Sequence, residues 1–118
     1  MELNQIAQGY FDGLSGGDMS AVPYAEDAIL WAPLGPDGLD KPIRGKKAIL
    51  AFFDAVLPLL ERVEVKHLFE DGEWACGRAF LTLSQPRGAV LRVSDVFHIV
   101  DGLISEQENH YDPRPALS

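Results

Sequence analysis

The clearest indication of the fold comes from residues 89–111, AVLRVSDVFHIVDGLISEQENHY. Asp101-Gly102 in the middle is a dipeptide typical of tight hairpin turns, and the run before it is rich in residues that favour strands. Every second residue across 93–99 would point to one side, and Asp95 is the only polar member of that set. A period of two with one apolar side indicates a strand with one buried face. The stretch therefore predicts a β-hairpin.

The chain before this hairpin has the same rhythm. Over residues 62–67 charged side chains alternate with Val63, Val65 and His67, which predicts a strand with His67 on its apolar side. Asp71-Gly72 is a second hairpin signal, and it opens another strand that runs through Ser84. Together these strands predict an antiparallel meander.

The N-terminal part of the chain has helical spacing instead. Over residues 3–14 the apolar side chains recur every three or four positions, and Gly16-Gly17 supplies a stop. Asp18 predicts the cap of a short second helix over residues 19–24. Residues 28–32 then predict a short strand.

A loop and a third helix complete the predicted elements. Residues 34–42 are dense in turn-forming residues, and we expect this loop to act as a mobile lid. The third helix has apolar positions from Ile49 to Leu60, and Pro58 disturbs its last turn. Helices followed by a meander predict an α+β fold, with one domain over residues 1–118. We expect a curved antiparallel sheet wrapped around the N-terminal helices and the long third helix, with a cone-shaped space between them.

The composition limits the compartment and the partners. The 118 residues are 47% hydrophobic, and 18 acidic against 10 basic residues give a net charge of −8. This charge repels phosphate groups, so we expect neither a nucleic acid nor a membrane surface as a partner. Cys76 is the single cysteine and cannot form an internal disulfide, and the N-terminus lacks the pattern of a signal peptide. We therefore expect a cytoplasmic protein whose partner is neutral or cationic.

Several short motifs occur in the order and spacing of a known superfamily. They are Tyr10-Phe11, YAEDA at residues 24–28, Ile43-Arg44-Gly45 with Phe52-Phe53, and Asp101-Gly102-Leu103-Ile104 before Tyr111-Asp112-Pro113. In these motifs the chain resembles the NTF2-like superfamily, in particular SnoaL-like domains and ketosteroid isomerase. The resemblance spans nearly the whole chain and implies a cone-shaped fold with a small-molecule pocket. Because the superfamily contains isomerases, dehydratases, cyclases and binding domains, the resemblance does not imply one reaction.

The resemblance also implies roles for particular residues. Tyr10 stands where ketosteroid isomerase has the tyrosine that stabilises an oxyanion, and Asp95 stands where it has a protonated acid that donates to the same oxygen. Ala32 stands where the isomerase has its catalytic aspartate, and an alanine carries no proton. Asn109 stands where the epoxide-hydrolase branch has an acid. The implied site therefore has two oxyanion donors without the usual base.

The residue types leave alternatives open for each candidate. Asp95 lies on an apolar strand face, where desolvation favours its neutral form, or it is an exposed partner of Arg92 or Arg78. Tyr10 is a pocket donor or a packing residue, and His67 is a general base or a core histidine.

The missing base and the ligand contacts come from other parts of the chain. Asp40 in the loop supplies a base if the loop covers the pocket, or it is a solvated turn former. We expect the ligand to contact three aromatic side chains and two buried amides, namely Trp31, Phe53, Phe97, Gln107 and Asn109. The histidines lack the spacing of metal ligands, so we expect no metal and no cofactor.

The strand after Asp71-Gly72 separates small from bulky residues. Ala75, Gly77 and Ala79 share one face, and if they point at the helices they leave unfilled volume for the pocket. The opposite face is bulkier, includes Trp74, and needs a cover. We expect a homodimer that forms through this outer sheet face.

Three functions remain open at this point. The first is an isomerase, dehydratase or cyclase that acts on an apolar, oxygen-bearing substrate, with His67 or Asp40 in place of the usual base. The second is a ligand-binding domain without catalysis, which Ala32 favours. The third is recognition of a partner protein through the outer sheet face.

Overall fold

The computed structural model describes residues 2–117. Its first element is the helix α1 (Leu3–Gly16), close to the predicted bounds. The apolar stripe of this helix is buried, and Gly17 ends it in the left-handed conformation (φ 73°), which glycine adopts without strain. The predicted first helix and its stop are therefore confirmed.

The predicted short helix over residues 19–24 is wrong. The carboxylate of Asp18 accepts a hydrogen bond from the backbone N–H of Ser20 (2.9 Å), which closes a tight turn. Pro23 has no N–H to donate, and Tyr24 already begins the strand β1 (Tyr24–Trp31). Pairing of Tyr24 with Ile104, far along the chain, outweighs the local helix signal.

The remaining elements largely follow the predicted order. After β1 come a two-residue strand that was not predicted, β2 (Ile43–Arg44), and the helix α2 (Lys46–Val56). Pro58 alters the end of this helix as predicted, since the last turn, η1 (Leu57–Leu59), is a 3-10 helix. The rest of the chain forms β3 (Leu60–Asp71), β4 (Trp74–Leu83), β5 (Val90–Val100), β6 (Leu103–His110) and the short helix α3 (Arg114–Leu117). No helix within residues 2–117 is long and apolar enough to span a lipid bilayer.

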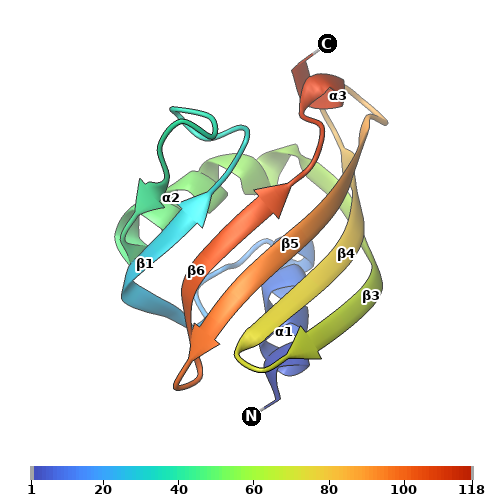
Figure 1. The fold of residues 1–118 in the computed structure, drawn as a ribbon. Coiled ribbons are helices and arrows are strands. Elements are labelled where there is room, and N and C mark those ends of the chain that lie inside the picture. Colours follow the sequence, from blue (N-terminus) through green and yellow to red (C-terminus); the bar gives the residue numbers. More distant parts are fainter. Residues whose placement is uncertain (1, 118) are drawn as a thin grey trace.

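The strands form one curved sheet in the order β2-β1-β6-β5-β4-β3 (Figure 1). Neighbouring strands are antiparallel except β1 and β6, which run parallel. The α+β class and the curved sheet are confirmed, but the sheet is mixed and not antiparallel throughout. Parallel pairing is possible because α2 and the meander separate β1 from β6 along the chain.

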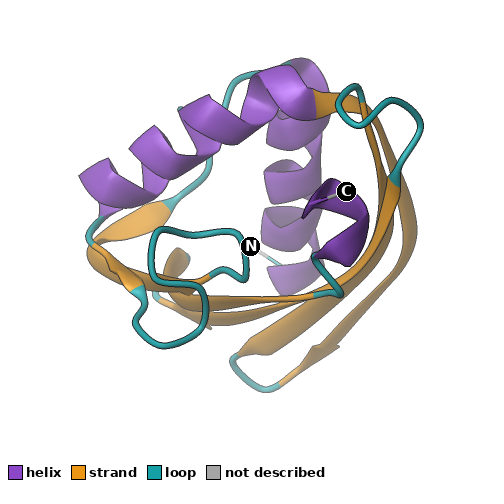
Figure 2. Ribbon diagram, turned by 90° about the horizontal axis from the view of Figure 1, so that it is seen from above, coloured by secondary structure: helices purple, strands orange, loops and turns teal. Residues whose placement is uncertain are grey.

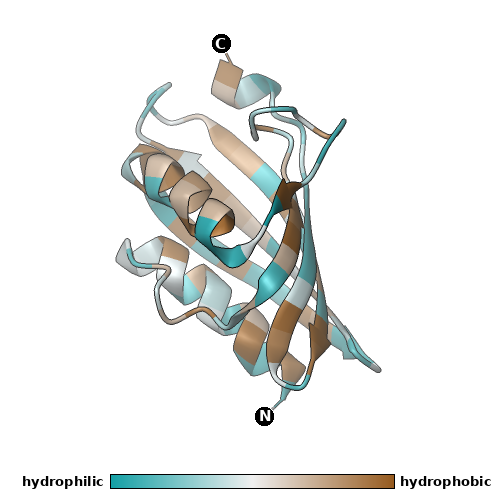
Figure 3. Ribbon diagram, turned by 90° about the vertical axis from the view of Figure 1, so that its left-hand side faces the viewer, coloured by the Kyte–Doolittle hydropathy of each residue, from teal (hydrophilic) through white to brown (hydrophobic). Residues whose placement is uncertain are grey.

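Both long helices lie on the concave side of the sheet, which we call the inner face (Figure 2). α1 packs on β3 and β4, and α2 packs on β1. Hydrophobic and hydrophilic residues alternate along the strands (Figure 3), and the buried set on β4 and β5 faces the helices. Figure 1 looks onto the opposite, outer face, which no helix of the described chain covers.

The small residues of β4 point at the helices as predicted, but they do not create a cavity. A Cβ atom at Gly77 would lie 2.4 Å from Cε2 of Phe11, so the glycine lets α1 approach the sheet closely. Ala75 and Ala79 are buried in the same region. The unfilled volume lies further along the strand, beside Leu81 and Leu83.

Candidate functional site

A cavity of about 740 Å³ lies between α2, the inner face of the sheet and the segment that follows β1. Most of its lining is apolar, and the polar exceptions are Tyr10, Gln85, Asp95, Asn109 and Tyr111. The volume lies within the range of small-molecule pockets. The described lining contains no Lys, Arg or His, so an anionic ligand would find no counter-charge.

Asp95 is the one acidic side chain in the described lining. It lies on the inner face of β5, as predicted, and is 2% exposed. Asn109 on the neighbouring strand β6 donates a hydrogen bond from Nδ2 to Oδ1 of Asp95 (2.7 Å). Burial raises the pKa of Asp95 to about 7, and hydrogen bonds from Asn109 and Tyr10 limit this rise. Near neutral pH the acid therefore exists in both protonation states.

The alternative position of Asp95, as an exposed partner of Arg92 or Arg78, is wrong. Both arginines lie on the outer face, where they pack over the ring of Phe80 at 4.4 Å (Arg92) and 5.1 Å (Arg78) from its centroid. Alternation along the strand points Asp95 and Arg92 to opposite faces.

Tyr10 reaches the same cavity from α1. Its ring packs edge-on against Phe53 and Phe97, with centroids 5.6 and 5.3 Å apart. Burial raises the pKa of Tyr10 well above its ordinary value, and negative charge on Asp95 adds to the rise. The hydroxyl therefore keeps its proton and can donate a hydrogen bond beside Asp95.

A second polar layer lies behind Tyr10 and outside the cavity lining. Gln107 on β6 is 0% exposed, and its Oε1 accepts a hydrogen bond from the hydroxyl of Tyr24. Its Nε2 has no partner that meets hydrogen-bond geometry within residues 2–117. The Gln107 side chain nevertheless interacts with the Tyr10 hydroxyl, and this interaction offsets part of the rise in the pKa of Tyr10.

Two tyrosines belong to the site without being candidates from the sequence. Tyr111 lines the cavity, and burial raises its pKa to about 12. Its alternation with Gln107 and Asn109 along the last strand was the signal that could have found it. Tyr24 lies in a segment whose sequence resembles a helix, and this hid its inward position.

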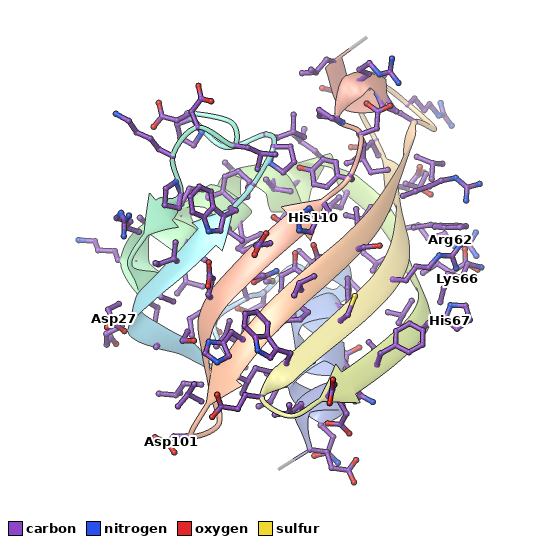
Figure 4. All side chains as sticks on the ribbon, viewed as in Figure 1. Asp27, Arg62, Lys66, His67, Asp101 and His110 are labelled. Carbon is purple, nitrogen blue, oxygen red and sulfur yellow. The ribbon has the colours of Figure 1, made fainter. Side chains whose placement is uncertain are left out.

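His67 does not reach the cavity. An irregularity in the pairing of β3 between Val65 and His67 shifts the alternation by one residue. The histidine therefore points outward (Figure 4), where its ring stacks on Phe69 and its Nδ1 lies 3.4 Å from Nη1 of Arg78. The predicted inner-face position of His67 is wrong, because a period of two does not reveal a bulge.

Two further candidates also lie away from the cavity. Trp31 is on the outer face of β1, where its indole N–H donates a hydrogen bond to Glu106 (3.0 Å). Asp40 is exposed in the loop between β1 and β2 and does not belong to the lining. Leu34 at the start of that loop does line the cavity.

The remaining expected ligand contacts separate into two groups. Phe53 and Asn109 line the cavity. Phe97 and Gln107 lie outside the lining, and each interacts with Tyr10. The structure thus places the first pair at the cavity wall and the second pair next to Tyr10, outside the lining.

Ala32 follows the end of β1 and is 1% exposed. Its carbonyl oxygen accepts a hydrogen bond from the backbone N–H of Gly35 (2.9 Å). The methyl side chain of Ala32 cannot carry a proton. Asp95 is therefore the acid of the described cavity lining that can. Within residues 2–117, no three His, Cys, Asp or Glu side chains gather closely enough to hold a metal ion.

Solved structures with the same fold include three instructive relatives. An NTF2-like protein from Cytophaga hutchinsonii has 16% identity and a TM-score of 0.78, with 100% of this chain and 97% of that chain covered. IdmH from Streptomyces antibioticus, a candidate polyketide cyclase, has 15% identity and a TM-score of 0.79, with 98% and 96% covered. A candidate polyketide cyclase from Sinorhizobium meliloti has 27% identity and a TM-score of 0.75, with 90% and 94% covered. These likenesses confirm the NTF2-like fold.

A search of curated proteins finds no match to this chain. A comparison of the sequence with models of protein families does find one. The model of the SnoaL-like domain matches residues 7–107, a span that contains Tyr10, Asp95 and Gln107. The predicted resemblance is thereby confirmed, and the chain belongs to the SnoaL-like domain family.

Proposed function

We propose that the protein moves a proton beside the carbonyl group of a neutral, largely apolar molecule bound in the cavity. The observation that carries this proposal is the environment of Asp95, a buried acid with a pKa of about 7 next to Tyr10 in an apolar cavity. A carboxyl group whose pKa lies near the working pH is an effective general base and general acid.

The site has the groups that such a proton transfer needs. Ionised Asp95 takes a proton from the carbon next to the carbonyl group. The C–H electron pair forms the C=C bond of an enolate, and the C=O π pair moves to the oxygen. Tyr10 donates a hydrogen bond to this oxygen, where negative charge develops. Asn109 holds Asp95 in place through its hydrogen bond.

The fate of the enolate decides the reaction. If Asp95 returns the proton to a different carbon of a conjugated enolate, the product is an isomer. If the enolate carbon first attacks a second carbonyl group of the same molecule, a ring closes and the new alkoxide takes the proton from Asp95. The likeness to the candidate polyketide cyclase from Sinorhizobium meliloti, at 27% identity, favours ring closure.

Hydrogen exchange tests the shared first step without knowledge of the natural substrate. We expect the protein to accelerate deuterium exchange at the α-carbons of 2-tetralone, a small apolar ketone, in D2O, as followed by NMR. Asp95→Asn and Tyr10→Phe should each lower the protein-dependent rate by about a hundredfold or more. Ser94→Ala, which changes the neighbouring outward residue of β5, is the matched control and should keep the rate. Equal rates in wild type and Asp95→Asn would overturn the proposal.

Ala32 favours a second candidate function, a ligand-binding domain without catalysis. The position where ketosteroid isomerase has its base is buried here and holds a methyl group. In this case 2-tetralone should bind in the cavity, and Tyr10→Phe should weaken the binding. Its α-hydrogens, however, should exchange no faster than in buffer.

We also propose that two copies associate through the outer sheet face. Lys66, Arg78 and Arg92 surround the ring of Phe80 on this face, at 4.4 to 5.1 Å from its centroid. Glu106 on β6 contributes negative charge to the same face, so a two-fold arrangement can place the basic part of one copy over the acidic part of the other. Light scattering should find a dimer that both Arg92→Glu and high salt weaken. A wild-type protein that stays monomeric at millimolar concentration would contradict this arrangement.

A further inference from the structure

Gln107 has no role in the proton transfer proposed above. It is 0% exposed and lies between two tyrosines, Tyr24 and Tyr10, with both of which its amide interacts. A primary amide accepts hydrogen bonds at its oxygen and donates them from its nitrogen. The orientation of this amide therefore decides which tyrosine hydroxyl faces its acceptor oxygen and which faces its donor nitrogen.

Tyr24 sets the orientation of the amide. The residue is 2% exposed, so its hydroxyl proton needs an acceptor within the protein. The acceptor found among the described residues is Oε1 of Gln107. The amide oxygen is thereby directed to Tyr24, and the amide nitrogen points away from Tyr24, toward Tyr10.

The amide nitrogen can only donate. Nε2 of Gln107 has no partner of full hydrogen-bond geometry within residues 2–117. The Gln107 side chain nevertheless interacts with the Tyr10 hydroxyl, and this interaction offsets part of the rise that burial causes in the pKa of Tyr10. Tyr10 therefore meets a donor on its buried side. Its own proton is left for Asp95 and the cavity, in agreement with the hydrogen bond that Tyr10 contributes to Asp95.

We infer that Tyr24 and Gln107 are positioning residues that hold Tyr10 as a hydrogen-bond donor toward the cavity. The cavity consequently selects molecules that present an acceptor oxygen, such as a ketone, over molecules of the same shape without one. This inference rests on the proposed function and deepens it, because it names the property of the substrate that the buried layer selects. Neither residue lines the cavity, so both act through Tyr10.

Tyr24→Phe tests the inference with a single atom removed. Without the Tyr24 proton, the Gln107 amide can turn its oxygen to Tyr10, whose hydroxyl then donates to Gln107 and not to the ligand. We expect the variant to bind 2-tetralone about tenfold more weakly than the wild type, since it loses about one hydrogen bond. Binding of tetralin, the same ring system without the oxygen, should stay unchanged. Calorimetric titration measures both affinities.

The double variant Tyr24→Phe/Gln107→Met separates positioning from loss of packing. Methionine fills a similar volume and offers no strong acceptor, so the Tyr10 hydroxyl again has the cavity as its partner. We expect 2-tetralone binding to recover most of the loss, although a second buried residue has been changed. Two outcomes overturn the inference: a double variant that binds no better than Tyr24→Phe, and a Tyr24→Phe variant that binds like the wild type.

A titration of Asp95 without ligand keeps this inference separate from the proposed function. When Tyr10 donates to Gln107, Asp95 loses a hydrogen bond that lowers its pKa. The pKa of Asp95, followed by carboxyl carbon NMR, should therefore rise in Tyr24→Phe and fall back in the double variant. If these shifts occur and 2-tetralone shows no catalysed exchange, the positioning stands and the proposed function fails. If exchange is catalysed and the pKa shifts are absent, the proposed function stands and the positioning by Tyr24 and Gln107 fails.

Discussion

The inner and outer faces of the sheet treat a carboxyl group in opposite ways. On the inner face, burial raises the pKa of Asp95 to about 7, and its partners are uncharged. On the outer face, the hydrogen bond from Lys66 (2.8 Å) lowers the pKa of Glu64. The residue type is nearly the same, and the difference lies in the water and the charge around it. The pKa of Asp95 therefore lies near neutral pH because the fold removes both water and charge from its surroundings.

Replacement of the inner acid should give the largest effect. The pKa of Asp95 is about 7 in the folded protein, above its ordinary value of 3.8, so the folded state favours the protonated acid. The corresponding stability is fully present below about pH 4 and is lost as the pH rises through 7. Relative to Asp95→Asn, the wild type should lose roughly 4 kcal/mol of unfolding free energy between pH 4 and pH 8. Urea unfolding of both proteins across this range measures the difference.

Asp27→Asn provides the control for this comparison, because Asp27 is exposed at β1 (Figure 4). Its pH profile of unfolding free energy should run parallel to that of the wild type. A parallel profile for Asp95→Asn as well would mean that the inner face does not hold its acid protonated.

A methyl group added to the inner face should have the next largest effect. Gly77→Ala places a Cβ atom 2.4 Å from Cε2 of Phe11, so the buried Phe11 ring, α1 or both must shift. We expect a loss of about 1–3 kcal/mol in unfolding free energy. Gly9→Ala is the matched control, because nothing lies within 4 Å of its Cβ position and alanine favours the helix. That variant should gain about 0.5–1 kcal/mol. If both variants unfold alike, the close approach of α1 is not what the glycine serves.

Removal of an outer-face side chain should have the smallest effect. His67→Ala takes away an exposed ring that stacks on Phe69. We expect a change of about 0.5 kcal/mol or less in unfolding free energy, and unchanged exchange of 2-tetralone. A strong loss of exchange in His67→Ala would show that this histidine acts in the reaction after all.

Local periodicity was enough to predict most of the elements and part of the site. The alternation along β5 placed Asp95 on the inner face, and the helical spacing of α1 placed Tyr10 there too. The prediction for His67 was wrong because one extra residue in β3 reverses the faces to which the following side chains point. The prediction of a helix up to Tyr24 was wrong because a strand partner eighty residues further along the chain overrides the local helix signal.

From the order of its residues alone, this chain could be assigned to its fold class and superfamily, and Asp95 could be proposed as a buried acid. The fold class and the inward side of Asp95 follow from patterns that repeat within a few positions, which the backbone geometry of helices and strands imposes. The superfamily was implied by a resemblance in the order and spacing of short motifs along the chain. Folding in three dimensions was needed to pair β1 with β6 and to bring Gln107 between two tyrosines. It also left Asp95 as the one acid at the described cavity, while His67 and Asp40 stay outside. These arrangements depend on contacts between distant residues, whose energies no local pattern contains.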